Sequence, residues 1–224
     1  MCGRYSFAIE DELIRERFGV TVRSAIYKAR YNCAPSQSLA VISTEEPEML
    51  SYYRWGLIPF WAKDPSIGNK LINARAETII EKPSFKKAFR SRRCLILSDG
   101  FFEWDKSSEK QPYRIILQDC APFSMAGIWD EWKNPEGEMI HSFSIITTRA
   151  NSLIEKIHDR MPVILKREDE KKWLGSPYEK ELLDLLLPFP SDQMKTYPVS
   201  KKVNSPLNDF REILDPVERR LLGK

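Results

Sequence analysis

Short apolar segments of strand length, separated by turn residues, constrain the fold of this chain more than any other feature of its sequence. Such segments fall at 41–42, 49–55, 94–97, 113–117, 123–129, 141–147 and 163–165. Helix-compatible stretches do not alternate regularly with them and fall at 7–18, 84–90, 151–157, 167–174 and 178–187. This irregular order is typical of α+β proteins. The sequence contains no G-x-G-x-x-G motif, which disfavours a Rossmann fold. We therefore predict an α+β fold with a mostly antiparallel, barrel-like sheet core and peripheral helices.

The length of 224 residues fits a single domain spanning 1–224. No uncharged apolar stretch reaches the roughly 20 residues that cross a bilayer. Charged residues, among them Arg4 and Glu10, interrupt any apolar core of a signal peptide. We therefore expect a cytoplasmic protein without membrane association.

Charge is distributed unevenly along the chain. Residues 1–93 carry 16 Lys or Arg against 10 Asp or Glu, whereas residues 94–224 carry 19 against 22. The first part ends in a basic cluster made of Lys86, Lys87, Arg90, Arg92 and Arg93. This asymmetry is compatible with a basic surface that binds the phosphate backbone of a nucleic acid. The alternative interpretation of the basic cluster is a solvated helix face.

The four cysteines and two histidines do not have the spacing of a metal site. Cys2, Cys33, Cys94 and Cys120 lie far apart, and none belongs to a C-x-x-C pair. We therefore expect free thiols and neither a metal nor another cofactor. Cys33, Cys94 and Cys120 are interpreted as small buried side chains.

Cys2 differs from the other cysteines because of its position after Met1. Removal of Met1 makes Cys2 a 1,2-aminothiol, whose amine and thiol have reference pKa values of roughly 7.7–8.0 and 8.5. Such a group can attack an acyl carbon with the amine as base, or capture an aldehyde as an imine that the thiol closes into a thiazolidine. The alternative is a cysteine that follows the start codon by chance.

Three further segments are candidates for binding or catalysis. If the segment that contains Asn73 and Arg75 is extended, the two side chains share a face. The amide could then hold a hydroxyl group and the guanidinium a phosphate. The alternative is a helix entry with a surface salt bridge. Glu103 lies among aromatic residues, where burial raises the pKa of a carboxyl; an exposed Glu at a strand end is the alternative. His158 is a candidate proton donor, and otherwise a structural loop histidine.

Eight short motifs occur in a fixed order along the chain. They are MCGR at 1–4, YNCAP at 31–35, WGLIP at 55–59, INARAET at 72–78, DGFFEW at 99–104, IITT at 145–148, HDRMP at 158–162 and YPVS at 197–200. This series resembles the SOS response-associated peptidase family of abasic site processing proteins. The resemblance runs from residue 2 to about residue 208, which leaves a tail at 209–224.

The resemblance implies a monomeric, single-domain protein that binds abasic sites in single-stranded DNA and becomes covalently linked to them as a thiazolidine, shielding the lesion in the DNA damage response. The match gives Cys2 as the nucleophile, Asn73 as the residue that positions the sugar, Glu103 as an acid–base group near the amine, and His158 as the group that assists ring opening. The matching DNA contacts are Arg4, Asn32, Pro35, Trp61, Arg75 and Arg160. The family's peptidase activity corresponds here to removal of Met1, autocatalytic or by an aminopeptidase. The protein would be cytoplasmic and would be found at the nucleoid when it is bound to damaged DNA.

This chain departs from the family at Phe60-Trp61, where relatives often carry two tryptophans, so stacking on DNA is expected to differ. Two other functions remain open. Glutamine amidotransferases also begin Met-Cys-Gly, which leaves an N-terminal-nucleophile amidohydrolase as one alternative. A non-covalent, β-rich module that binds single-stranded nucleic acid is the other.

Overall fold

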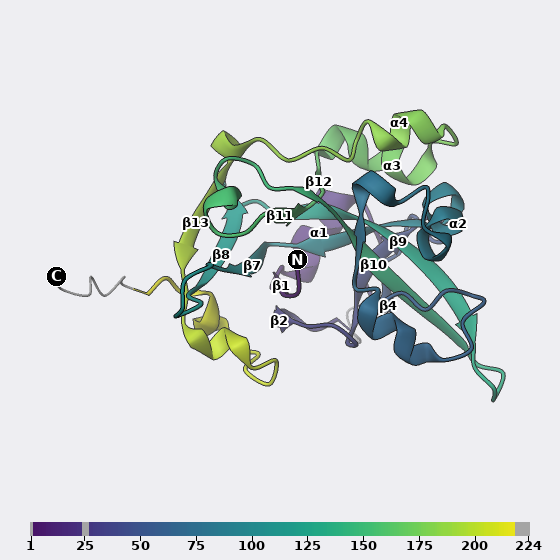
Figure 1. Ribbon diagram of the computed structural model, residues 1–224, viewed down its shortest axis with the longest axis horizontal. Helices are drawn as coiled ribbons and strands as arrows, with labels where there is room; N and C mark the ends of the chain where they lie inside the picture. Colours follow the sequence, from purple (N-terminus) through teal and green to yellow (C-terminus); the bar gives the residue numbers. More distant parts are fainter. Residues whose placement is uncertain (1, 24–26, 218–224) are drawn as a thin grey trace.

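The computed structural model describes residues 2–23 and 27–217, and the first of its two sheets contains the strand that follows Cys2. The strands of this five-stranded sheet are all antiparallel to their neighbours. Their order is β13 (Met194–Pro198), β8 (Pro112–Leu117), β7 (Gly100–Trp104), β1 (Tyr5–Phe7) and β2 (Arg30–Cys33). In Figure 1 this sheet lies to the left, with β1 near the middle of the molecule.

The second sheet closes on itself. Its order is β11 (Arg160–Pro162), β10 (Met139–Arg149), β4 (Ser51–Trp55), β3 (Ser38–Ser43), β6 (Arg93–Ser98), β9 (Phe123–Lys133) and β12 (Ile164–Leu165), with β5 (Asn73–Arg75) beside β10. Because β10 also pairs with β9, strands β10, β4, β3, β6 and β9 form a closed barrel. The pairs β10–β4 and β10–β5 are parallel, and the others are antiparallel. The predicted α+β fold with a mostly antiparallel, barrel-like core is confirmed.

One apolar core joins the two sheets. Tyr5 on β1 and Trp55 on β4 are both buried, and their ring centroids lie 5.3 Å apart. Phe143 on β10 stacks on the Trp55 ring and continues the same core. The shared core makes the two sheets parts of one compact domain.

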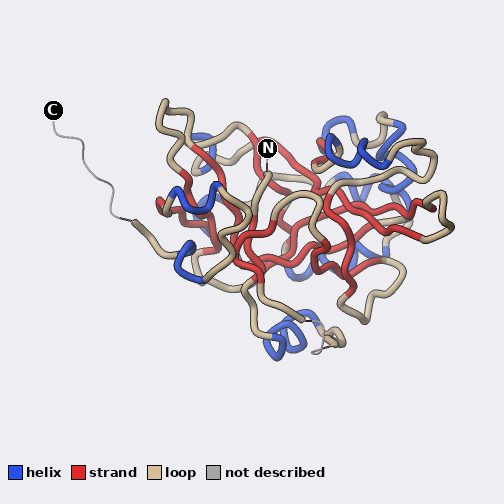
Figure 2. Tube along the Cα trace, turned by 90° about the horizontal axis from the view of Figure 1, so that it is seen from below, coloured by secondary structure: helices blue, strands red, loops and turns tan. Residues whose placement is uncertain are grey.

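The helices lie at the periphery of the sheets (Figures 1 and 2). The α-helices are α1 (Asp11–Phe18), α2 (Pro83–Ser91), α3 (Glu170–Gly175) and α4 (Glu179–Leu183). The 3-10 helices are η1 (Pro65–Lys70), η2 (Ala76–Thr78), η3 (Ile154–Lys156), η4 (Arg167–Asp169), η5 (Ser191–Gln193), η6 (Lys201–Asn204) and η7 (Arg211–Leu214). Helix α2 covers the stretch predicted at 84–90, begins with proline at its first position, where proline is tolerated, and buries Phe85 and Phe89. No helix in the described part of the chain is long and apolar enough to cross a bilayer.

Several expected elements differ from the observed ones. The helix predicted from residue 7 begins at Asp11, because Phe7 is buried and belongs to β1. The helix predicted at 151–157 is reduced to η3, and the Asn151 side chain caps this short turn by accepting hydrogen bonds from the main-chain N–H groups of Leu153 and Ile154. Cys33 and Cys94 are buried as expected, whereas Cys120 is exposed, in a turn between β8 and β9 with φ of 61°.

Most of the basic cluster is engaged within the protein. Arg90 pairs with Glu179, and Arg92 pairs with Asp130 and Glu131. Arg93 is buried and donates to main-chain carbonyls. Only Lys86 and Lys87 of the five are exposed without an ion pair among the described residues. The cluster is therefore mainly structural.

Candidate active site

Cys2 lies where the two sheets meet. It lies three positions before the start of β1 of the five-stranded sheet, and it is fully buried. The side-chain Nδ2 of Asn73, on β5 of the larger sheet, donates a 2.9 Å hydrogen bond to the main-chain carbonyl of Cys2. Burial raises the pKa of the Cys2 thiol well above its usual value, and the nearby Glu103 carboxylate raises it further. The resting sulfur is therefore a protonated thiol rather than a thiolate.

Glu103 reaches the same place from the neighbouring strand. It lies on β7, which pairs with β1, and the main-chain N–H of Phe102 donates a 2.9 Å hydrogen bond to the carbonyl of Arg4. The side chain is buried, which raises the pKa of the Glu103 carboxyl to about 7. The alternative of an exposed carboxylate at a strand end is therefore wrong. A carboxyl with this pKa exchanges protons near neutral pH.

His158 lies directly before β11, on the side of the larger sheet. The main-chain N–H of Arg160 donates a 3.0 Å hydrogen bond to its Nδ1. Asp159 Oδ1 lies 3.1 Å from the same nitrogen, but the Asp159 side chain is 72% exposed, whereas the amide belongs to a paired strand. We therefore assign the neutral tautomer with the proton on Nε2. Burial lowers the pKa of His158, so this neutral form is present at pH 7.

Asn73 also provides a buried acceptor. Its Oδ1 is inaccessible to solvent and has no hydrogen-bond partner among the described residues. A buried amide oxygen without a donor is uncommon in folded proteins, and it indicates a group that is satisfied when a ligand binds. A hydroxyl group of a substrate is a suitable donor for it.

Three of the predicted DNA contacts are accessible. Arg75 is exposed on β5, and its side chain makes no ion pair or hydrogen bond among the described residues. The alternative of a helix entry with a surface salt bridge holds for the segment in part, because Arg75 directly precedes η2 and Glu77 pairs with Arg160, but Arg75 takes no part in that salt bridge. Trp61 is 47% exposed in the loop between β4 and η1. Pro35 is half-buried in the turn that follows β2. These side chains are open to a ligand in the present conformation.

The other three predicted DNA contacts already have partners within the protein. Arg4 donates to Oδ1 of Asn32, which is fully buried. Arg160 forms a bidentate ion pair with Glu77, at 2.6 and 2.9 Å, and also donates to the carbonyl of Thr147. A role of these residues in binding DNA stays a prediction, and for Asn32 a direct contact would require breaking internal hydrogen bonds.

Two contacts next to these residues could not be predicted from the sequence. Glu77 neutralises Arg160, and the ion pair holds the pKa of the Glu77 carboxyl below its usual range. Lys87 places its Nζ 3.9 Å from the centroid of the Phe60 ring, a cation–π contact that covers one face of this ring. The main-chain N–H of Phe60 donates to Asp130 on β9, which fixes the loop that carries Trp61. Only the three-dimensional arrangement reveals these contacts.

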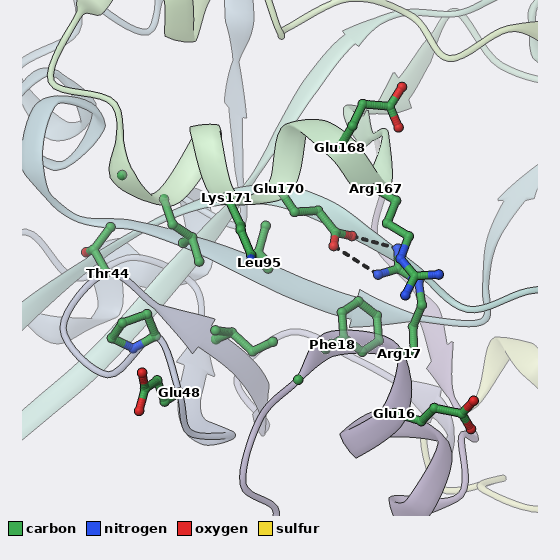
Figure 3. A pocket seen from close by; sticks show the side chains of 15 residues that line it. Glu16, Arg17, Phe18, Thr44, Glu48, Leu95, Arg167, Glu168, Glu170 and Lys171 are labelled. Atoms are coloured by element: carbon green, nitrogen blue, oxygen red, sulfur yellow. Dashed lines mark hydrogen bonds and ion pairs between the residues drawn. The ribbon is translucent and has the colours of Figure 1, made fainter.

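A separate cavity of about 840 Å³ lies elsewhere, between the end of α1, the β3–β4 connection and α3 (Figure 3). Arg17 and Glu170 form a bidentate ion pair at its wall, and both charge signs occur around its rim. None of the predicted site residues lines this cavity. In the described part of the chain, no three His, Cys, Asp or Glu side chains gather as a metal site would require. The Cys2 region therefore remains the candidate active site.

The chain is similar in sequence and in structure to known proteins. A family model described as SOS response associated peptidase (SRAP) matches residues 1–206. Abasic site processing protein YoqW of Bacillus subtilis (strain 168) is 45% identical over 222 residues, covering 96% of this chain and 99% of that protein. Abasic site processing protein HMCES of Xenopus tropicalis is 33% identical, covering 84% of this chain and 66% of that protein. A crystal structure of a protein from Bacteroides thetaiotaomicron has a TM-score of 0.89 at 33% identity, covering 97% of this chain and 100% of that chain.

Proposed function

The chain belongs to the SOS response associated peptidase family, and from this we propose that it processes abasic sites in single-stranded DNA by attaching itself covalently through Cys2. The relatives that are 45% and 33% identical are named abasic site processing proteins. The observation that carries the proposal is the hydrogen bond from Asn73 to the Cys2 carbonyl, because it brings a cysteine at position 2 together with the residues of both sheets.

The proposed chemistry requires the amine of Cys2. Met1 lies outside the described residues, and its removal, autocatalytic or by an aminopeptidase, exposes this amine. The ring-opened deoxyribose of an abasic site is an aldehyde. The amine adds to its C1 carbon, and loss of one water gives an imine. The thiol then adds to the same carbon and its proton passes to the nitrogen, which closes the thiazolidine without any change of oxidation state.

Each polar group of the candidate site has a place in this sequence of steps. The Nε2–H of His158 is suited to donating a hydrogen bond to the ring oxygen as the sugar opens. Glu103, with a pKa of about 7, is suited to taking a proton from the amine and returning it to the departing water. The thiol is neutral at rest, so it gives up its proton only as the carbon–sulfur bond forms. The unpaired Oδ1 of Asn73 is available to a sugar hydroxyl.

The accessible residues support a single strand as the substrate. Arg75 offers a guanidinium without a partner in the described part of the chain, which is suited to a phosphate. Trp61 is exposed on a loop that Asp130 anchors, and an exposed aromatic ring stacks on an unpaired base. Attachment at such a lesion would shield it during the DNA damage response.

The proposal is tested with the Cys2 thiol removed. An oligonucleotide with an aldehydic abasic site is incubated with the wild type, Cys2→Ala and Cys2→Ser, and the products are separated on a denaturing gel. We expect a heat-stable band for the wild type alone, with salt-sensitive binding retained by both variants. A tetrahydrofuran abasic analogue, which cannot open to an aldehyde, should give no band with any protein. An undiminished band from Cys2→Ala, or glutaminase activity in place of cross-linking, would overturn the proposal.

A further inference from the structure

Asn32 uses every hydrogen-bonding group of its side chain within the protein. It is fully buried on β2. Its Oδ1 accepts a 2.8 Å hydrogen bond from Nη1 of Arg4. Its Nδ2 donates to three main-chain carbonyls of one C-terminal segment, those of Val203, Ser205 and Asn208. The amide oxygen and the amide nitrogen are thus both engaged within the protein, and burial shields them from a ligand.

The guanidinium of Arg4 has an inner and an outer end. Its Nη1 is held at 2.8 Å by Asn32 and at 2.7 Å by the carbonyl of Val203. Among the described residues, its Nη2 makes only an exposed 3.5 Å contact, with the carbonyl of Asn204. The inner end is therefore fixed and the outer end is presented to solvent, two residues from Cys2.

The C-terminal segment 203–209 is itself firmly anchored. Val203 is buried in a small apolar cluster on the outer face of β7, together with Phe102. Asp209 accepts hydrogen bonds from the main-chain N–H groups of Tyr31 and Asn32 and forms a 2.7 Å ion pair with Arg30. Residues 203–209 and β2 thus form one rigid support for the Arg4 side chain.

From these contacts we infer that Asn32 is a positioning residue, which fixes the Arg4 guanidinium so that its outer end receives a DNA phosphate beside the reacting sugar. This inference rests on the proposed function, since the ligand is the strand that carries the abasic site. It replaces the predicted direct contact of Asn32 with DNA by an indirect one.

The physical reason is preorganisation. A free arginine side chain loses considerable rotamer freedom when it binds a phosphate, and Asn32 removes that freedom before the strand arrives. Asn32 then affects DNA binding only by way of the charged Arg4 guanidinium. A neutral residue that acts in this way changes the salt dependence of binding, whereas a neutral direct contact or a general structural role does not.

The test is a double-mutant cycle with Arg4→Ala, Asn32→Ala and the double variant, using a labelled single strand that contains a tetrahydrofuran abasic analogue, which binds without reacting. Affinity is measured over a series of salt concentrations. We expect both single variants to bind roughly tenfold or more weakly. We also expect both to lower the slope of log affinity against log salt by roughly 0.7, and the double variant to match Arg4→Ala. Additive losses, or an unchanged slope for Asn32→Ala, would overturn the inference.

A second pair of variants keeps the test decisive if Asn32→Ala fails to fold. Asp209→Ala removes the acceptor for the main-chain N–H of Asn32, whereas Asp209→Asn retains an accepting oxygen. We expect the slope to fall in Asp209→Ala and to be restored in Asp209→Asn, and an equal slope in both would contradict the inference. The proposed function is tested separately, with the wild type. If the wild type fails to cross-link an aldehydic abasic site, the proposed function is wrong, whatever the result of the double-mutant cycle.

Discussion

The side-chain amide of Asn73 donates a 2.9 Å hydrogen bond to the main-chain carbonyl of Cys2. Asn73 belongs to β5, which runs parallel to β10 of the barrel, whereas Cys2 precedes the first strand of the other sheet. The bond therefore fixes the peptide plane between Cys2 and Gly3 relative to the barrel. The amine and the thiol of a mature Cys2 would both take their positions from this plane.

Replacing Asn73 with aspartate should misplace the nucleophile. The variant keeps the size of the side chain but cannot donate to the Cys2 carbonyl, and a charged oxygen would face a carbonyl oxygen. We expect cross-linking at saturating DNA to slow at least fivefold, which corresponds to the loss of about 1 kcal/mol from one hydrogen bond. Single-turnover kinetics measure this rate. Asn134→Asp, in the turn between β9 and β10, is the matched control, and an equal effect there would assign the loss to charge alone.

Glu103 should make the stability of the protein depend on pH. Burial raises the pKa of this carboxyl from 4.5 to about 7, so the folded protein binds its proton more tightly than the unfolded chain does. The resulting stabilisation is complete below about pH 4.5 and is lost as the pH rises through about 7. Between about pH 4 and pH 8, the free energy of unfolding of Glu103→Gln should therefore gain roughly 3 kcal/mol relative to the wild type. Urea unfolding at both pH values measures the difference, and parallel curves would show that the carboxyl is not perturbed.

His158 and His141 form a matched pair, since the chain has only two histidines. His158→Ala should slow cross-linking by about 10²–10⁴, the usual contribution of a general acid or base, while DNA binding changes little. His141 stacks on Tyr53, with ring centroids 5.0 Å apart, and takes no part in the proposed site. His141→Ala should therefore cross-link at the wild-type rate. Equal single-turnover rates for both variants would remove His158 from the mechanism.

Arg75 should contribute one phosphate contact. Arg75→Ala is expected to weaken binding to all single strands similarly and to lower the slope of log affinity against log salt by roughly 0.7. Arg90→Ala is the control, because Arg90 is also exposed but already pairs with Glu179 at 2.7 Å. Fluorescence titrations at several salt concentrations give both slopes. The contact is absent if the slopes of the two variants coincide.

The barrel could be predicted from the sequence because its longer strands leave an apolar pattern. Strands β6, β9 and β10 follow from the apolar segments at 94–97, 123–129 and 141–147, and helix α2 follows from the helix-compatible stretch at 84–90. Strands β1, β5 and β11 could not be predicted, because each has three residues and forms only by pairing with a neighbour. Residues of the candidate site lie on these short strands or next to them.

The identities of the candidate site residues follow from motifs, but their partners do not. Glu77 and Arg160 are 83 positions apart in the chain, and Arg4 and Asn32 are 28 apart. Nothing local in the sequence indicates that two predicted phosphate ligands are held by internal hydrogen bonds and ion pairs. The structure supplies this information, and it changes the expected role of Asn32 from contact to support.

The central claim is that the amine and the thiol of Cys2 react together, and the intact mass of the cross-linked product tests it most directly. Mature protein that begins at Cys2 is compared with a variant that carries an uncleaved glutamate before Cys2. We expect the mature protein to give an adduct equal to protein plus oligonucleotide minus one water, unchanged by later treatment with borohydride because the ring is already saturated. The extended variant should bind the strand but give no stable adduct. A heat-stable adduct of the extended variant, or a mature adduct that gains two hydrogens from borohydride, would contradict the thiazolidine.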